Sequence, residues 1–154
     1  MKNEKINVAV VGGHRCSKKI YNLAYSVGQL IARQGWILIC GGRTGVMEAA
    51  CKGAKQAKGL TVGILPSYNG KDANPYLDVK IPTGLGFARN ALVVRAAEAV
   101  IAFTGKEGTL SEIGFALSEK KPVVGIETWD IEGVIKASSA KDAIAKVKAK
   151  LHVK

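Results

Sequence analysis

Residues 99–112 combine an apolar run, a glycine turn and the start of a helical pattern. The run from Ala99 to Phe103 is unbroken, which is typical of a strand that is buried on both faces of a parallel sheet. Glycines follow at positions 105 and 108, and helical spacing begins at Leu110. A strand, a turn and a helix in this order leave free backbone N–H groups at the positive end of the helix dipole, where an anion is stabilised. This stretch therefore predicts a phosphate-binding turn.

Thr109 and Glu112 have the spacing of a capping box. In a capping box, the two side chains accept hydrogen bonds from free N–H groups at the start of a helix. The pair predicts a helix that begins at Thr109. Capping of this helix would be a structural role for Glu112, in addition to any role in chemistry.

The same order of strand, glycine turn and helix occurs twice more. Residues 37–45 contain an apolar run followed by glycines, with Thr44 as the predicted N-cap of the next helix. Residues 8–13 follow the same pattern, with Ser17 as the predicted N-cap. Because the carboxyl ends of parallel strands share one edge of a sheet, we expect the three turns to converge there and to form a nucleotide site.

Strand-like and helical segments alternate along the chain. Strands are expected over residues 6–11, 36–40, 60–65, 77–81, 99–103 and 122–126, and helices over 17–33, 44–58, 86–97, 109–120 and 140–151. Gly35 and Gly59 occupy positions where a helix ends in a left-handed residue. The alternation predicts an α/β fold, namely a three-layer, Rossmann-like, doubly wound and mainly parallel sheet of about six strands flanked by helices. With 154 residues and no linker or repeat, we expect a single nucleotide-binding domain over residues 1–154.

The formal net charge of +11 attracts anionic ligands and raises the question of nucleic-acid binding. Much of the excess lies near the carboxyl terminus, where lysines alternate with apolar residues at helical spacing, as on a solvated helix face. Aromatic residues make up 6% of the chain, and none lies in a basic cluster that would stack bases. Nucleic acid is therefore not the favoured partner.

Three cysteines without CxxC spacing and two histidines predict neither a disulfide framework nor a metal site. Cys40 and Cys51 are expected to be small buried residues, and Cys16 a turn residue. The longest apolar runs have the length of strands, too short for a bilayer, and no signal peptide is recognisable. We therefore expect no membrane segment and a cytoplasmic location.

The irregular segment 66–76 follows a predicted strand and should emerge on the same edge as the glycine turns. It is interpreted either as a wall or lid of the site or as an ordinary surface loop. Its candidate contact residues are Tyr68, Asn69 and Lys71.

Arg89 lies early in a predicted helix whose other residues are almost all apolar. A buried arginine needs an anionic partner, because an unpaired buried charge is costly. That partner is either a carboxylate, such as Glu98 or Glu112, or a phosphate held by the guanidinium fork. Arg89 also replaces the third glycine of a GxGxxG pattern that Gly84 and Gly86 begin, so NAD binding is not predicted, and no Walker A pattern is present.

Four segments together resemble one known superfamily. They are Gly41-Gly42-Arg43-Thr44-Gly45-Val46-Met47-Glu48, Gly59-Leu60-Thr61-Val62-Gly63-Ile64-Leu65-Pro66, Ala88-Arg89-Asn90 and Gly105-Lys106-Glu107-Gly108-Thr109-Leu110-Ser111-Glu112. This ordered set is similar to the LOG-like superfamily, also called SLOG and formerly "lysine decarboxylase". Within it the chain most resembles short members of the molybdenum cofactor carrier type, and more distantly the DNA-processing protein DprA. The resemblance covers about residues 6–126.

The resemblance implies a Rossmann-like nucleotide-binding fold. In the LOG enzymes, a PGGxGTxxE motif and an upstream arginine hydrolyse the N-glycosidic bond of a nucleoside 5'-monophosphate, and Glu112 and Arg89 take those catalytic places here. The chain departs from the motif at Thr104 and Lys106, and it has Asn90 where the family has lysine after the arginine. Binding is expected despite these changes, and hydrolysis is an alternative. Lysine decarboxylation is not expected, because no lysine with an acidic pyridinium partner is evident.

The candidate site contains glycines of the three turns and the polar residues beside them. Its phosphate-binding residues are Gly12, Gly13, Gly41, Gly42, Thr44, Gly45, Met47, Arg89, Asn90, Gly105, Gly108, Thr109 and Glu112. The first hypothesis is a carrier or sensor that binds an AMP-like nucleotide or molybdopterin. The second is a phosphoribohydrolase, and the third a DprA-like protein that binds single-stranded nucleic acid. We also expect a homodimer or larger homo-oligomer, because the helices over 44–58 and 86–97 have more apolar surface than one sheet face needs.

Overall fold

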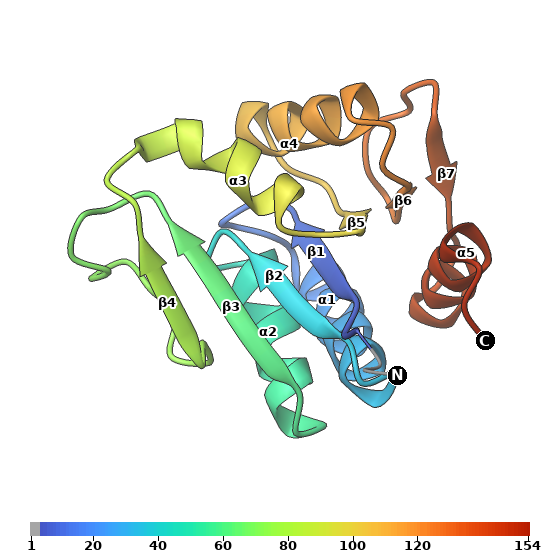
Figure 1. Cartoon of the computed structure of the whole chain (residues 1–154), viewed down its shortest axis with the longest axis horizontal. Helices are drawn as coiled ribbons and strands as arrows, with labels where there is room; N and C mark the ends of the chain where they lie inside the picture. Colours follow the sequence, from blue (N-terminus) through green and yellow to red (C-terminus); the bar gives the residue numbers. More distant parts are fainter. Residues whose placement is uncertain (1–3) are drawn as a thin grey trace.

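In the computed structural model, which describes residues 4–154, seven parallel strands form one sheet in the order β4-β3-β2-β1-β5-β6-β7 (Figure 1). The strands are β1 (Asn7–Val11), β2 (Ile37–Cys40), β3 (Leu60–Leu65), β4 (Val79–Pro82), β5 (Ala99–Ala102), β6 (Val123–Gly125) and β7 (Val134–Lys136). The helices are α1 (Lys18–Arg33), α2 (Val46–Gln56), α3 (Asn90–Arg95), α4 (Glu107–Ser118) and α5 (Ala140–Leu151), with a 3-10 turn η1 (Gly86–Arg89) before α3. The predicted α/β, Rossmann-like fold class is confirmed.

Helices cover both faces of the sheet. Successive side chains of a strand point to opposite faces, so each face carries apolar side chains that helices bury. Val8 and Val10 of β1 belong to the core under α1, α2 and α5. Ala9 and Val11 belong to the core under α3 and α4, which lie together on the other face (Figure 1). The strand order reverses at β1, whose neighbours are β2 and β5. In doubly wound sheets, such a reversal opens a crevice at the carboxyl ends of the strands.

Helices α1 and α2 pack so closely that their backbones are in contact at two glycines. A Cβ atom on Gly28 of α1 would lie 1.9 Å from the carbonyl oxygen of Ala50, and one on Gly53 of α2 would lie 1.9 Å from that of Tyr25. These glycines and the alanines around them therefore serve packing within the chain. The apolar surface of α2, which was expected to be available for oligomerisation, is used by α1.

The structure confirms one of two predicted helix starts and corrects the other. The Oγ of Ser17 accepts the backbone N–H of Ile20 at 3.2 Å, which confirms Ser17 as the N-cap of α1. Thr44, however, does not cap α2, because that helix begins at Val46 after Gly45, which has φ 65°. Thr44 precedes the N-cap residue Gly45, and its hydroxyl donates to the carbonyl oxygen of His14 instead of capping the helix.

One helix end, one helix and one strand also differ from expectation. Gly35 takes the predicted left-handed conformation with φ 76°, but after α2 this conformation falls on Lys58 with φ 60° instead of Gly59. The predicted helix over 86–97 is instead the 3-10 turn η1 followed by the short helix α3, which ends at Arg95. Strand β7 was not predicted, because three half-exposed residues are too few for a periodic pattern.

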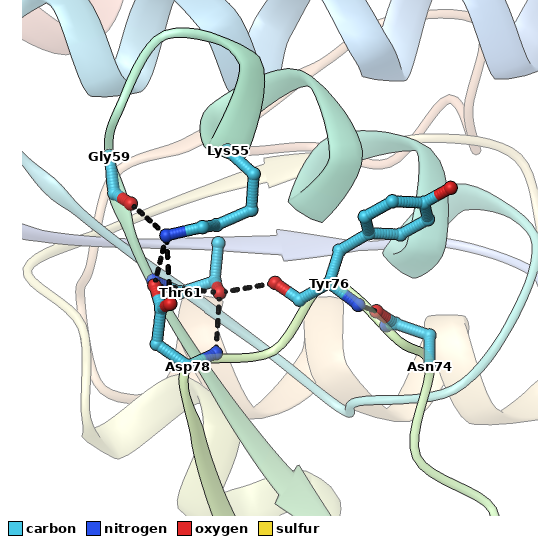
Figure 2. A network of polar contacts seen from close by, with 6 residues as sticks. All are labelled: Lys55, Gly59, Thr61, Asn74, Tyr76 and Asp78. Carbon is cyan, nitrogen blue, oxygen red and sulfur yellow. Dashed lines mark hydrogen bonds and ion pairs between the residues drawn. The ribbon is translucent and has the colours of Figure 1, made fainter.

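A polar network holds β4 against β3, which have no helix between them (Figure 2). The carboxylate of Asp78 accepts hydrogen bonds from the backbone N–H of Thr61 at 3.0 Å and from the Nζ of Lys55 at 2.9 Å. The buried hydroxyl of Thr61 donates to the carbonyl oxygen of Tyr76 at 2.6 Å. This network fixes the end of the loop over residues 66–78.

Within residues 4–154, none of the helices has the length and apolar character needed to span a bilayer.

Candidate functional site

A cavity of about 500 Å³ lies where the glycine turns after β1, β2 and β5 meet η1, α3 and α4. Its position is the strand-order reversal at β1, where this class of sheet binds ligands. The lining residues are Gly12, His14, Arg15, Arg43, Met47, Phe87, Arg89, Asn90, Lys106, Glu107, Gly108, Thr109, Ser111 and Glu112.

The three glycine turns converge as expected, and hydrogen bonds join them. The N–H of Gly13 donates to the carbonyl oxygen of Thr104 at 3.0 Å, and the N–H of Val46 donates to that of Gly13 at 3.0 Å. The hydroxyl of Thr44, freed from a capping role, donates to the carbonyl oxygen of His14 at 2.8 Å. The turn after β1 is therefore bonded to both of the others, and side chains on all three are held near one another.

Helix α4 presents its N-terminus to the cavity. Its N-cap is Lys106, which makes no side-chain capping bond, and its first intrahelical bond runs from the N–H of Leu110 to the carbonyl oxygen of Lys106 at 3.0 Å. The N–H groups of Glu107, Gly108 and Thr109 therefore have no partner within the helix, and all three residues line the cavity. Such an end binds anions.

The predicted capping box is wrong. Because α4 begins at Glu107, Thr109 lies inside the first turn of the helix. The side chain of Thr109 packs against Gly105, and a Cβ atom added to Gly105 would lie 2.0 Å from the Oγ1 of Thr109. Glu112 lies one turn further on, away from the helix start. A capping role therefore does not account for Glu112.

Arg89 is buried, with 6% of its surface exposed, and its guanidinium is poorly satisfied. The Nη2 atom reaches the carbonyl oxygen of Gly41 only at 3.5 Å, and Nε has no hydrogen-bond partner. Burial lowers the pKa of Arg89, and the charge of Glu112 opposes this effect. Within residues 4–154, Arg89 forms no ion pair, and its predicted partner Glu98 instead accepts the N–H of Asn7 at 2.6 Å.

Glu112 lines the same cavity and is 7% exposed. Burial raises its pKa to about 8, although the positive charge of Arg89 pulls the pKa down. At neutral pH the neutral acid therefore predominates, so Glu112 can donate a proton or hydrogen bond. An uncharged Glu112 also leaves the charge of Arg89 available to another anion.

Asn90 connects η1 and α3 with the start of α4. Its Nδ2 donates to the carbonyl oxygen of Gly108 at 3.4 Å and to the Oγ of Ser111 at 3.2 Å. Its Oδ1 is buried and has no partner. Asn90 thus combines a role in holding the α4 turn with a free acceptor in a residue that lines the cavity.

The expected site residues fall into two groups. Those that line the cavity are Gly12, Met47, Arg89, Asn90, Gly108, Thr109 and Glu112, whereas Gly13, Gly41, Gly42, Thr44, Gly45 and Gly105 belong to the turns but are not lining residues. The loop residues Tyr68, Asn69 and Lys71 do not line it. No group of three or more potential metal ligands occurs in the part of the chain from Glu4 to Lys154.

Cations at the cavity mouth were not among the expected residues. Arg15, Arg43 and Lys106 line the cavity from the three different turns. Burial lowers the pKa of His14, and so do the charges of these three cations around it. A signal was present in the sequence, because each of the three follows a glycine of its turn within two residues.

The loop over residues 66–78 contributes through Asn74, which was also not predicted. Asn74 is buried, and its N–H and Nδ2 donate to the carbonyl oxygens of Gly42 and Arg43, both at 2.9 Å. The loop therefore supports the turn after β2 from behind rather than covering the cavity. The sequence offered no cue that distinguished Asn74 from Asn69, because both lie among turn residues.

The parallel sheet, its strand-order reversal and the cavity at that point define a Rossmann-like ligand-binding protein. The chain belongs to the SLOG cluster4 family, whose family model matches residues 5–153. The resemblance to LOG-like and molybdenum cofactor carrier-like proteins is thereby confirmed. An uncharacterized protein of Archaeoglobus fulgidus is 45% identical over 123 residues, which are 79% of this chain and 80% of that protein.

Two solved structures extend this likeness over nearly the whole chain. The molybdenum cofactor binding protein of Rippkaea orientalis is 40% identical with a TM-score of 0.92, over 97% of this chain and 99% of that one. The molybdenum cofactor carrier protein of Chlamydomonas reinhardtii is 36% identical with a TM-score of 0.87, over 96% and 99%.

A second group of relatives is more distant. A cytokinin riboside 5'-monophosphate phosphoribohydrolase of Mycobacterium tuberculosis is 31% identical over 121 residues, and the match spans 72% of this chain but only 64% of the enzyme. DprA of Streptococcus pneumoniae is 21% identical with a TM-score of 0.72, which shows a shared fold alone.

Proposed function

We propose that the cavity binds a small phosphate-bearing ligand, either a mononucleotide or a pterin-type phosphate, and that the protein acts as a carrier or sensor. The observation that carries this proposal is the buried guanidinium of Arg89, which has a free Nε and no carboxylate in ion-pair contact within residues 4–154. A buried charge in this condition is costly unless an anion pairs with it. A phosphate oxygen supplies that pairing.

The start of α4 supplies further donors for the same phosphate. The N–H groups of Gly108 and Thr109 lack partners within the helix, and both residues line the cavity with Arg89. Backbone donors and a guanidinium fork suit the tetrahedral arrangement of phosphate oxygens. The lining also includes Met47 and Phe87, whose apolar surface suits the planar ring of a purine or pterin.

The relatives favour the same ligand classes. Proteins named for binding or carrying the molybdenum cofactor match nearly the full length of the chain, and this supports a pterin ligand. The phosphoribohydrolase relative supports a nucleoside 5'-monophosphate, but the match covers under two thirds of that enzyme.

An alternative function is hydrolysis of the N-glycosidic bond of a nucleoside 5'-monophosphate. The observation that favours it is Glu112, which is buried beside the binding residues, has no capping role and has a raised pKa of about 8. In this reaction, water adds to the anomeric carbon, the bond to the base breaks and the base leaves with a proton. A protonated Glu112 can supply that proton, and as a carboxylate it can position the water.

One experiment separates the two functions. The protein is screened by thermal shift against AMP, GMP, CMP and UMP, and each mixture is analysed by chromatography for free base. A ligand at a hundred times its dissociation constant adds about 2.7 kcal/mol of apparent stability. A shift without released base supports the carrier or sensor. A shift with base release that Glu112→Gln abolishes supports the hydrolase, and the exposed Glu107→Gln provides a control at the same cavity.

We further propose that the chain forms a homo-oligomer. Large apolar side chains are exposed at Val79 and Ile81 on β4, Leu92 on α3 and Phe115 on α4. Val79 and Ile81 lie two residues apart on one face of the edge strand β4, and neighbouring exposed apolar groups are typical of a surface that another subunit covers. Light scattering after size exclusion should give a mass above the 16.2 kDa of one chain, and Leu92→Ser with Phe115→Ser should lower it. A single-chain mass for the unaltered protein would refute this proposal.

A further inference from the structure

Each glycine turn of the cavity carries one cation that the proposed phosphate position does not use. Arg15 follows β1, Arg43 follows β2 and Lys106 follows β5, and all three line the cavity. Arg15 and Lys106 are exposed and Arg43 is half-buried. Within the described range 4–154, none of the three forms an ion pair.

The backbone bonds between the turns hold these cations together. In the turn after β1, the N–H of Gly13 donates to the carbonyl oxygen of Thr104. The carbonyl oxygen of His14 in the same turn accepts the hydroxyl of Thr44. Burial, and after it the charges of Arg43, Arg15 and Lys106, lower the pKa of His14, which is consistent with three cations near one imidazole. Like charges gathered in this way destabilise the fold unless an anion neutralises them.

The cavity therefore has positive charge at two depths, an inner level at Arg89 and an outer level at the three turn cations. Arg89 is buried in the lining, whereas the three turn cations are accessible to solvent. The acidic residues of the lining do not neutralise the outer level. Glu112 is mostly protonated at neutral pH, and Glu107 is a single exposed carboxylate against three cations. One phosphate at Arg89 and α4 leaves the outer cations without a counter-charge.

We propose that the ligand carries a second phosphate-type group, which binds the outer cations Arg15, Arg43 and Lys106 while the first binds Arg89 and the start of α4. The preferred class is then a nucleoside diphosphate, or another ligand with two linked phosphates, over a nucleoside monophosphate. This inference rests on the proposed function, because it needs a phosphate at the inner position. A cavity of about 500 Å³ lies within the range of sites for ligands of this size.

Calorimetric titration of AMP, ADP and inorganic pyrophosphate, without divalent cations, tests this inference. We expect ADP to bind about tenfold more tightly than AMP, because the second phosphate gains charge-assisted hydrogen bonds. In the double variant Arg15→Gln and Arg43→Gln, the affinity for ADP should fall more than that for AMP, so that the ratio drops to about two or less. The double variant Arg33→Gln and Lys141→Gln loses the same charge at exposed sites outside the cavity lining and should keep the original ratio.

The outcomes separate this inference from the proposed function. Equal affinities for AMP and ADP would overturn the second phosphate position and leave the first intact. A preference for ADP that persists in the Arg15→Gln, Arg43→Gln variant would also overturn it, because the outer cations would then not be its cause. Failure of both nucleotides and of pyrophosphate to bind would overturn the inference together with the proposed nucleotide ligand. Far-ultraviolet circular dichroism of each variant checks that the fold is kept.

Discussion

Arg89 at the end of η1 and Glu112 on α4 line one cavity, each more than nine-tenths buried, yet they do not form an ion pair. Burial dominates both titrations, since it lowers the pKa of Arg89 and raises that of Glu112 to about 8. A pair arranged for stability would have its charged atoms in contact. This arrangement instead leaves a cation ready for an external anion beside a carboxyl that is neutral at pH 7.

The raised pKa of Glu112 predicts a specific dependence of stability on pH. The pKa is about 8 in the folded protein against 4.5 for an unperturbed glutamate, so the folded state holds the proton more tightly. The contribution of Glu112 to the free energy of unfolding is therefore greatest below pH 4.5 and is lost as pH rises towards 8, by on the order of 4 kcal/mol. Urea unfolding of the protein and of Glu112→Gln at pH 5 and pH 9 measures this effect. The variant should gain stability relative to the original protein at the higher pH, and a constant difference between them would contradict the raised pKa.

Asn74 is predicted to be important for both stability and ligand affinity. Asn74→Ala removes the bonds from Nδ2 to the carbonyl oxygen of Arg43 and from the N–H of Tyr76 to Oδ1. Losing these two partly buried hydrogen bonds should cost about 1–3 kcal/mol of unfolding free energy. The affinity for a phosphate ligand should also fall, because the turn that carries Arg43 loses its support. Thermal unfolding and ligand titration measure the two effects. The exposed Asn69→Ala in the same loop is the control, and if both variants behaved alike, the support from Asn74 would be disproved.

Lys121 is predicted to stabilise the end of α3. Its Nζ donates to the carbonyl oxygens of Val94 at 2.8 Å, Arg95 at 3.1 Å and Ala97 at 2.7 Å. These carbonyls belong to the last turn and its exit, where a cation is favourable. Lys121→Met keeps the aliphatic stem but removes the donors, and it should cost about 1–3 kcal/mol in chemical unfolding. A loss no larger than that of the exposed Lys141→Met on α5 would show that these bonds add nothing.

The parallel sheet and the convergence of the turns could be predicted because they depend on patterns that are local in the sequence. Apolar runs such as residues 99–103 identify buried strands, and the glycines after them identify their carboxyl ends. The same local signals led to the wrong helix start at Thr109. The pattern of a capping box does not reveal that the backbone already turns into a helix at Glu107.

Features that depend on contacts between distant segments could not be predicted. Asn74 bonds Gly42 and Arg43 across 31 residues of sequence that include α2 and β3, and no periodic signal encodes that contact. The unpaired state of Arg89 is of the same kind, since the sequence left open whether its partner is a carboxylate, such as Glu98 or Glu112, or a phosphate. The cations Arg15 and Arg43 could have been proposed from their places beside the turn glycines, but only the folded chain brings them to one cavity.

Calorimetric titration of AMP into the protein and into Arg89→Gln tests whether Arg89 pairs with a phosphate of the bound ligand. Glutamine retains a polar side chain but removes the charge and the fork, so we expect the affinity for AMP to fall by about a hundredfold, as for loss of one partner of a buried charge pair. The exposed Arg95→Gln, which removes a surface ion pair with Glu119, should leave the affinity for AMP unchanged. Equal binding of AMP by the protein and by Arg89→Gln would contradict the account, because the buried guanidinium would then have no part in holding the ligand.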